Sequence, residues 1–149
     1  MTIKADIELP IARPPAVVWE HLTALERFPE WLVASGITRV EREPGPLGAG
    51  TRLRIDQRVA GNAAVLDGIV TAWQPPYRFA FRATHPDGIT VEAEAAIAAD
   101  GPTSRLRWSL RIGLPLKLRL FEGMAAPEVK RAANTDLLGF KRRLESIAG

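Results

Sequence analysis

A run of alternating apolar and polar residues from Ile37 to Leu114 constrains the fold of this chain most, because glycine and proline cut it into strand-length pieces. Successive side chains of a strand point to opposite faces of a sheet, so a period of two predicts strands with one buried face. Turn sequences such as Gly61-Asn62 and Asp100-Gly101-Pro102 join the pieces, as is typical of hairpins. We therefore expect consecutive antiparallel strands in one sheet.

Further elements flank this run. Residues Ala5 to Ile11 alternate in the same way and predict one earlier strand. Two short helices should follow, one beginning at Pro15 and one over the segment from Trp31 to Gly36. Apolar residues three or four apart predict a final helix from about Pro127 to Ala148, roughly 30 Å long, with one face on the sheet. Gly139 lies inside this helix and should weaken or bend it.

Hairpin lengths determine which side chains share a face of the sheet. The expected inner face is almost entirely apolar, with Gln57 as its one clear polar side chain. The outer face takes most of the arginines, and the register places Arg82, Glu92 and Arg111 in one cross-strand row. Opposite charges in such a row stabilise a sheet by tenths of a kcal/mol to about 1 kcal/mol each. A structural role therefore explains the arginines without a function.

Composition excludes several classes of protein. The 149 residues are 46% hydrophobic and include no cysteine, which fits one domain over residues 1–149 and excludes disulfides, a thiol nucleophile and a cysteine-bound metal. The net charge is +3, but acidic residues are interleaved with the basic ones, so we expect no nucleic-acid partner. No apolar stretch approaches the roughly 18 residues of a membrane span, and no signal-peptide core is present. We expect a cytoplasmic protein, monomeric or homodimeric, without stable membrane insertion.

No catalytic residue can be identified from these patterns. His21 and His85 are expected at the surface, and no serine–histidine–aspartate arrangement or metal-ligand spacing occurs. We therefore expect no metal and no cofactor. Gln57 has two equal interpretations: it hydrogen-bonds a ligand, or backbone or trapped water satisfies it. Asn134 and Asp136 lie beside the apolar stripe of the last helix, where a solvated position is favoured over one at a cavity mouth.

The inner face mixes large and small side chains, which either interlock into a solid core or leave a cavity walled by aromatic rings. Small residues near the middle of adjacent strands favour the cavity. The large residues are Phe79, Phe81 and Trp108, and the small ones are Gly68, Ala72, Ala83, Ala93 and Ala95. The expected ligand-binding residues are Trp31, Leu53, Ile55, Gln57, Val70, Phe79, Phe81, Val91, Ala93, Trp108, Leu110, Met124, Leu137 and Phe140.

The connection from Leu114 to Met124 has no clear secondary structure in its sequence. Lys117 and Arg119 alternate with leucines there. Two interpretations stay open, a segment that touches membranes or gates a pocket and an ordinary, partly buried linker, and the linker is favoured.

Three local motifs follow one another along the chain: IARPPAVVWEHLTALERFPEW, PLGAGTRLR and TAWQPPYRFAFR. Together they resemble motifs of the START-like superfamily, most closely of its polyketide cyclase/dehydrase-like branch. The resemblance implies an α+β helix-grip fold, in which a curved seven-stranded antiparallel sheet wraps around a long C-terminal helix and two short helices follow the first strand. It also implies a cavity between sheet and helix. Members bind or transport lipids, hormones and polyketides, or cyclise and dehydrate aromatic polyketides.

Three functional hypotheses follow. The leading one is binding, with transport as its extension, of a small hydrophobic or aromatic molecule in that cavity. The alternative is an enzyme similar to polyketide cyclases and dehydratases. Cyclases of the superfamily generally use polar pocket groups, and here the arginines fall on the outer face, which favours binding. The third hypothesis is a protein-interaction module that uses the outer arginines.

Overall fold

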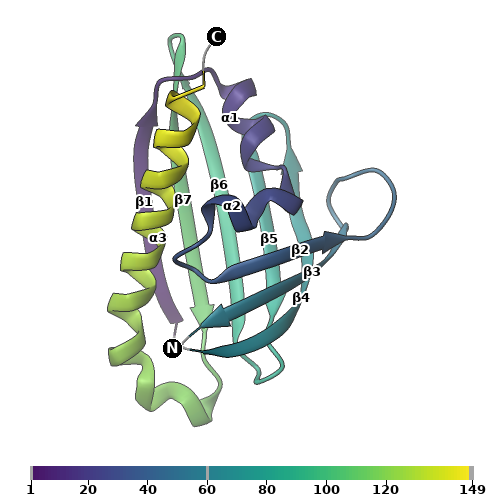
Figure 1. The fold of residues 1–149 in the computed structure, drawn as a ribbon, viewed down its shortest axis with the longest axis vertical. Helices are drawn as coiled ribbons and strands as arrows, with labels where there is room; N and C mark the ends of the chain where they lie inside the picture. Colours follow the sequence, from purple (N-terminus) through teal and green to yellow (C-terminus); the bar gives the residue numbers. More distant parts are fainter. Residues whose placement is uncertain (1, 60, 148–149) are drawn as a thin grey trace.

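The computed structural model describes residues 2–59 and 61–147 and has the expected helix-grip fold (Figure 1). Seven antiparallel strands form one sheet in the order β1-β7-β6-β5-β4-β3-β2. The strands are β1 (Thr2–Ile11), β2 (Ile37–Arg42), β3 (Arg52–Val59), β4 (Asn62–Gln74), β5 (Arg78–Thr84), β6 (Thr90–Asp100) and β7 (Thr103–Gly113). The helices are α1 (Pro15–Leu22), α2 (Phe28–Trp31) and α3 (Glu122–Glu145), with single 3-10 segments η1 (Leu25–Arg27) and η2 (Leu116–Phe121).

The sheet curves strongly around its interior. In Figure 1, β6 and β7 run along the long axis of the molecule, whereas β2 and β3 lie across it. The helix α3 runs beside β1 and β7, and α1 and α2 cover the remaining part of the concave face. This arrangement encloses the apolar faces of all three helices and of the sheet.

The predicted strand register is confirmed over most of the sheet. Leu53 pairs with Gly68 and Ile55 with Leu66. Arg82 pairs with Glu92, which pairs with Arg111, as the outer row requires. Alternation and turn length therefore determined the faces of these strands correctly.

One bulge in β4 changes the predicted faces. The register shifts between Val70 and Ala72, so Ala72 pairs with Ala80 and Trp73 pairs with Phe79. A single extra residue exchanges the two faces beyond it. The prediction that Ala72 faces inward was therefore wrong, and Trp73 packs inside, 4.9 Å from the Trp19 ring.

The second short helix differs from its prediction. It spans Phe28–Trp31, with Pro29 in its first turn rather than as an interruption. The helix does not continue to Gly36, because the amides of Ala34 and Ser35 donate to the Asp136 side chain instead of to helical carbonyls. The helix thus ends earlier than the local sequence pattern predicted, because an acceptor distant in sequence binds the amides that would continue it.

The long helix α3 begins at Glu122, five residues before the predicted start at Pro127. Proline removes one backbone donor, so the cost inside the first turns is limited to about one hydrogen bond and a steric adjustment. The regular helix ends at Glu145, and residue 148 of the predicted range lies outside the described residues. The Glu145 carboxylate accepts from Lys141 Nζ at 2.7 Å and from the Ala12 amide at 2.8 Å, which joins this end of α3 to the end of β1.

Replacing Gly139 with alanine is expected to stabilise the protein by about 0.5–1 kcal/mol, because glycine is unfavourable in a helix interior. Gly139 is exposed, and nothing lies within 4 Å of where its Cβ would stand. The urea midpoint of unfolding measures the effect. Gly36→Ala is the matched control: Gly36 has φ +79° and its Cβ would stand against the Arg58 carbonyl oxygen, so that variant should be destabilised. A loss of stability in Gly139→Ala would contradict the expectation.

Candidate functional site

A cavity of about 270 Å³ lies between the concave face of the sheet and the first half of α3. Most of its wall is apolar and comes from both the sheet and the helices. The lining residues are Phe28, Leu32, Ala34, Ser35, Ile37, Ile55, Gln57, Val59, Leu66, Phe81, Ala83, Val91, Ala93, Trp108, Leu110, Ile112, Glu128, Val129 and Ala132.

Small side chains in the central strands create this space. Ala83 pairs with Val91, and Ala93 lies between Phe81 and Leu110 on neighbouring strands. Gly68 acts differently, because a Cβ there would stand 3.2 Å from the Leu53 Cβ. Two of the predicted small residues therefore line the cavity, whereas Gly68 permits close packing of β3 against β4.

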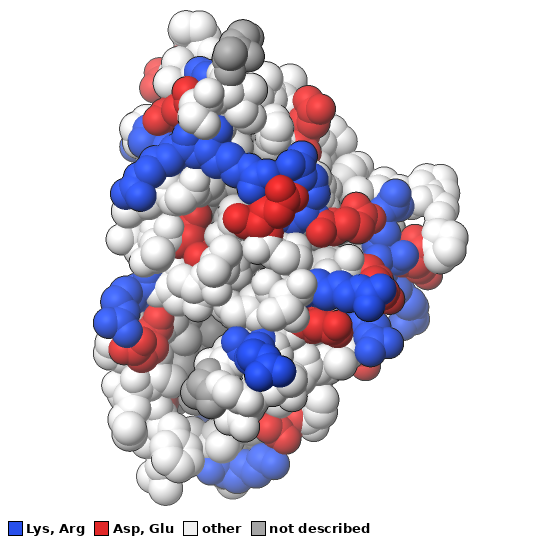
Figure 2. Space-filling model, in the orientation of Figure 1, with Lys and Arg blue, Asp and Glu red and all other residues white. Residues whose placement is uncertain are grey.

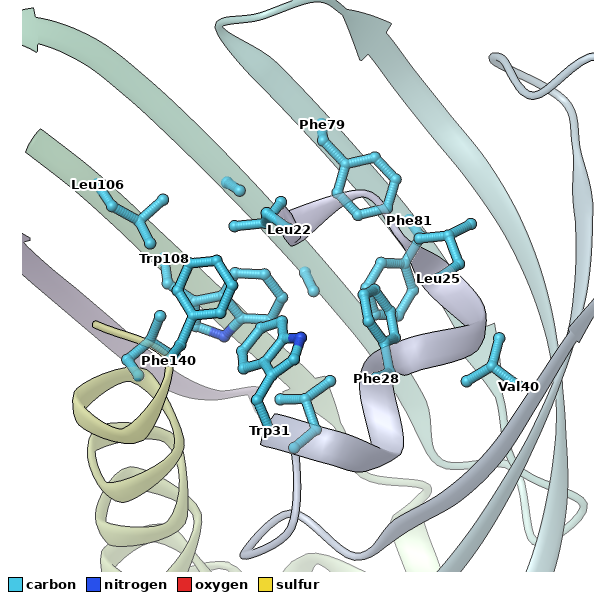
Figure 3. Packing of buried hydrophobic residues seen from close by; sticks show 14 of the residues in the cluster. Leu22, Leu25, Phe28, Trp31, Val40, Phe79, Phe81, Leu106, Trp108 and Phe140 are labelled. Carbon is cyan, nitrogen blue, oxygen red and sulfur yellow. The ribbon is translucent and has the colours of Figure 1, made fainter. Parts of the chain in front are cut away.

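An aromatic cluster fills the interior beside the cavity. Trp31 from α2 lies 4.7 Å from the Phe140 ring and 5.6 Å from the Trp108 ring, and Phe28 lies 5.9 Å from Phe81. In Figure 3, Phe28 and Trp31 project from α2 toward rings that belong to the sheet and to α3. This cluster joins α2, the sheet and α3, and its rings from Phe28, Phe81 and Trp108 also form part of the cavity wall.

Polar groups gather at one edge of the cavity around the loop after α2. Gln57 Nε2 donates to the Ser35 carbonyl oxygen at 2.9 Å. Asp136 Oδ2 accepts from the Ser35 amide at 2.9 Å and from its hydroxyl at 2.7 Å, and Oδ1 accepts from the Ala34 amide at 2.8 Å. A continuous network thus links α3, the loop and β3.

Asp136 is 3% exposed, so its favoured assignment to solvent was wrong. Three hydrogen-bond donors, from a loop about a hundred residues away in sequence, take the place of the water that would otherwise solvate the carboxylate. Buried charges of this kind need such partners. Asn134 is exposed, in agreement with the solvated interpretation. For Gln57, backbone satisfaction of the amide nitrogen is what the structure contains.

Half of the expected ligand-binding residues line the cavity and half lie elsewhere. Of the predicted residues that do not line the cavity, Met124 is exposed on the first turn of α3. The others are buried in the packed core. The lining ones are Ile55, Gln57, Phe81, Val91, Ala93, Trp108 and Leu110. The buried ones outside the wall are Trp31, Leu53, Val70, Phe79, Leu137 and Phe140.

Sequence reasoning missed lining residues from two sources. Ile112 belongs to a predicted inner strand face and Val129 to the predicted apolar stripe of the last helix, so strand alternation and the helical stripe carried a signal for both. Ala34 and Ser35 lie in the loop after α2, where no periodicity indicates direction. Their position follows from the contact with Asp136.

A larger hollow of about 620 Å³ lies on the outer face of the sheet. Its charged residues include the pairs Arg78–Glu94 at 2.8 Å and Arg107–Asp6 at 3.6 Å. These exposed ion pairs are the cross-strand contacts expected of a solvated sheet face. We therefore place the candidate site in the smaller apolar cavity rather than in this hollow.

Among the described residues, the carboxyl groups with shifted pKa values lie away from the cavity. Hydrogen bonds from Arg27 and Arg143 lower the pKa of Glu30 to about 2. A hydrogen bond from Lys141, assisted by the Ala12 amide, lowers the pKa of Glu145. Both carboxylates join α3 to neighbouring segments, so these shifts reflect structural contacts.

Residues 2–59 and 61–147 contain no cluster of three histidine, aspartate or glutamate side chains suited to a metal ion. In the same residues, no helix has the length and the apolar character that a membrane span requires.

Comparison with known proteins identifies the family. Residues 2–145 match the family model described as polyketide cyclase/dehydrase and lipid transport. The chain belongs to this family. The resemblance to the polyketide cyclase/dehydrase-like branch of the START-like superfamily is thereby confirmed. As its description states, the polyketide cyclase/dehydrase and lipid transport family is associated with two functions, cyclase or dehydrase activity and lipid transport.

Several solved structures share the fold of this chain. The Zhui aromatase/cyclase of a Streptomyces species has a TM-score of 0.78 and 17% identity, over 97% of this chain and 94% of that one. A Thermus thermophilus protein has a TM-score of 0.76 and 19% identity, over 98% of this chain and 99% of that one. A Mesorhizobium loti protein has a TM-score of 0.73 and 20% identity, over 98% of this chain and 99% of that one. No curated protein matches the sequence.

Proposed function

We propose that this protein binds and carries a compact apolar molecule that bears a hydrogen-bond donor, such as a hydroxyl group, in the cavity beneath α3. The composition of the wall supports this most directly. Apolar side chains form most of the wall, and hydrogen-bond acceptors occur at one edge. No lysine or arginine is among the described residues that line it.

The apolar wall supplies the affinity in this proposal. Phe28, Phe81 and Trp108 present aromatic surface, and aliphatic side chains complete the wall. Burial of apolar ligand surface contributes about 25 cal/mol per Å² before the cost of immobilising the ligand. Such a surface selects weakly among ligands of similar shape, since one methylene is worth only about 1–3 kcal/mol.

The polar edge supplies the orientation. Gln57 uses its amide nitrogen on the Ser35 carbonyl, which leaves Oε1 as an acceptor. The Ser35 hydroxyl donates to Asp136, so its lone pairs are also acceptors. A ligand hydroxyl can donate to this edge. A ligand carboxylate would meet acceptors and no cation there, and its lost hydration would not be replaced.

The size of the cavity limits the ligand. About 270 Å³ is the volume of about nine water molecules at about 30 Å³ each. It lies just below the range of about 300–1,000 Å³ that is usual for ligand pockets. A two-ring phenol therefore suits a cavity of this volume better than a long-chain lipid does.

Gln57→Leu is expected to weaken binding of 2-naphthol about three- to tenfold, equivalent to one hydrogen bond of about 1 kcal/mol. Binding of 2-methylnaphthalene, which has no donor, should change less than twofold. Fluorescence titration of both probes measures the difference. Gln74→Leu makes the same change at an exposed position of β4 and should affect neither. Equal weakening of both probes would remove Gln57 from the orienting role.

A second candidate is a cyclase or dehydratase, and one contact favours it. The Ser35 hydroxyl lines the cavity and donates to the buried Asp136 carboxylate at 2.7 Å, so a proton acceptor stands one hydroxyl away from a ligand. Ser35→Ala distinguishes the candidates. In an enzyme it should abolish turnover of a bound polyketide-like compound and retain binding, whereas in a carrier the bound compound stays chemically unchanged in both proteins.

Native mass spectrometry of the freshly purified protein tests the proposal directly. A discrete extra mass that leaves on denaturation identifies the ligand after extraction. The proposal expects a neutral, mainly apolar compound with a hydroxyl or amine group. A bound fatty acid, or no adduct together with no thermal shift from a panel of phenols, would overturn it.

A further inference from the structure

Four large apolar side chains are exposed where η2 runs into α3. Leu116 is 78% exposed, Leu120 91%, Phe121 54% and Met124 76%. We name these four residues the apolar end patch. In Figure 1 the segment forms the lower end of the molecule, and in Figure 2 that end shows uncharged surface beside a group of basic side chains. Clustered exposure of this kind marks an interaction surface more often than scattered single residues do.

The patch lies next to the cavity along the chain. Over the eight residues after Met124, α3 contributes Glu128, Val129 and Ala132 to the cavity wall. At its other end, η2 starts after Pro115, whose side chain lies against the β5–β6 hairpin near Gly88. A body that covered the patch would therefore stand at the cavity end of the molecule.

Basic residues are interleaved with the patch. Lys117 and Arg119 are exposed in η2 between the leucines. Neither makes an ion pair with a carboxylate of the described residues. Protein interfaces are depleted of charge at their centres, whereas interfacial membrane segments combine large apolar side chains with lysine and arginine. Two free cations at a protruding apolar end complement an anionic lipid surface.

We propose that the apolar end patch docks this protein reversibly onto anionic membrane surfaces. Leu120, Phe121 and Met124 enter the acyl boundary, and Lys117 and Arg119 meet the lipid headgroups. Docking in this way places the cavity end of α3 against the bilayer, where apolar molecules are dissolved. The proposal goes beyond ligand binding and does not depend on it, because the docking residues and the polar edge around Gln57 share no side chain.

The test is cosedimentation of the full chain with vesicles of phosphatidylcholine alone and of phosphatidylcholine with 30% phosphatidylserine. The wild type should bind the anionic vesicles and lose most of that binding at high salt, because exposed charges are screened. Leu120→Ser/Met124→Ser and Lys117→Glu/Arg119→Glu should each lower the partition coefficient at least tenfold. These residues are exposed, so the circular dichroism melts of both variants should match the wild type.

Two controls separate docking from other effects. Tyr77→Ser removes an exposed aromatic side chain at the β4–β5 turn, at the other end of the sheet, and should bind as wild type does. Gln57→Leu should also dock normally, so a failed cavity and a failed patch give different results. The proposal is overturned if the wild type ignores anionic vesicles at low salt, if patch variants bind equally, or if the patch instead supports a homodimer that Leu120→Ser/Met124→Ser dissociates.

Discussion

Asp136→Asn is expected to destabilise the protein by about 2–4 kcal/mol, because a hydrogen-bonded buried charge is replaced by a group that cannot serve all its partners. The carboxylate accepts from the Ala34 amide, the Ser35 amide and the Ser35 hydroxyl. An asparagine of the same shape offers one oxygen and points an NH₂ donor at other donors. Urea unfolding followed by circular dichroism measures the loss.

The control for this substitution lies on the same helix. Asn134 is exposed two residues earlier, so Asn134→Ala should change the stability by less than about 0.5 kcal/mol. Ser35→Ala removes one of the three bonds to Asp136 and should cost about 1 kcal/mol. If Asp136→Asn costs less than Ser35→Ala does, the carboxylate does not hold the loop.

Ala93→Phe is expected to reduce 2-naphthol binding at least a hundredfold and to leave the fold intact. Ala93 is buried, lines the cavity and lies between Phe81 and Leu110 on adjacent strands. A phenyl ring there occupies the space that a ligand would fill. Because the space is empty, the ring displaces few packed atoms. Fluorescence titration and thermal melting report binding and stability separately.

Ala95→Phe is the matched control for the filled cavity. Ala95 is 1% exposed on the same strand and pairs with Phe79 and Trp108. Unlike Ala93, it does not line the cavity. Overpacking a filled core typically costs about 1–3 kcal/mol or more. Ala95→Phe should therefore lower the melting temperature more than Ala93→Phe does. Equal destabilisation by both would mean that no open space exists at Ala93.

Strand faces were predictable where turns and alternation acted together. The row of Arg82, Glu92 and Arg111 follows from hairpin lengths, and the structure confirms it. The β4 bulge at residue 71 left no signal in composition or spacing, since an extra threonine is compatible with either register. Because of this bulge, Trp73 rather than Ala72 lies on the inner face. One unpaired residue thus moves every side chain beyond it to the opposite face of the strand.

The candidate site was predictable only in part, for a related reason. Strand parity identified Ile55, Phe81 and Ala93 as inward residues, and all three line the cavity. Phe79 and Phe140 have the same character in sequence, yet they are packed core. Facing inward is a local property, whereas bordering empty space depends on which other side chains arrive from α2 and α3.

Local periodicity and turn chemistry are properties of neighbouring residues, so the order of elements, the apolar inner face and the family motifs could all be read from the chain. Asp136 illustrates what could not. Its burial depends on donors from Ala34 and Ser35, a hundred residues away, and no local pattern records such a contact. The cavity, its polar edge and the exposed end of η2 likewise arise from how α2, α3 and the curved sheet meet, because packing is decided by distant partners.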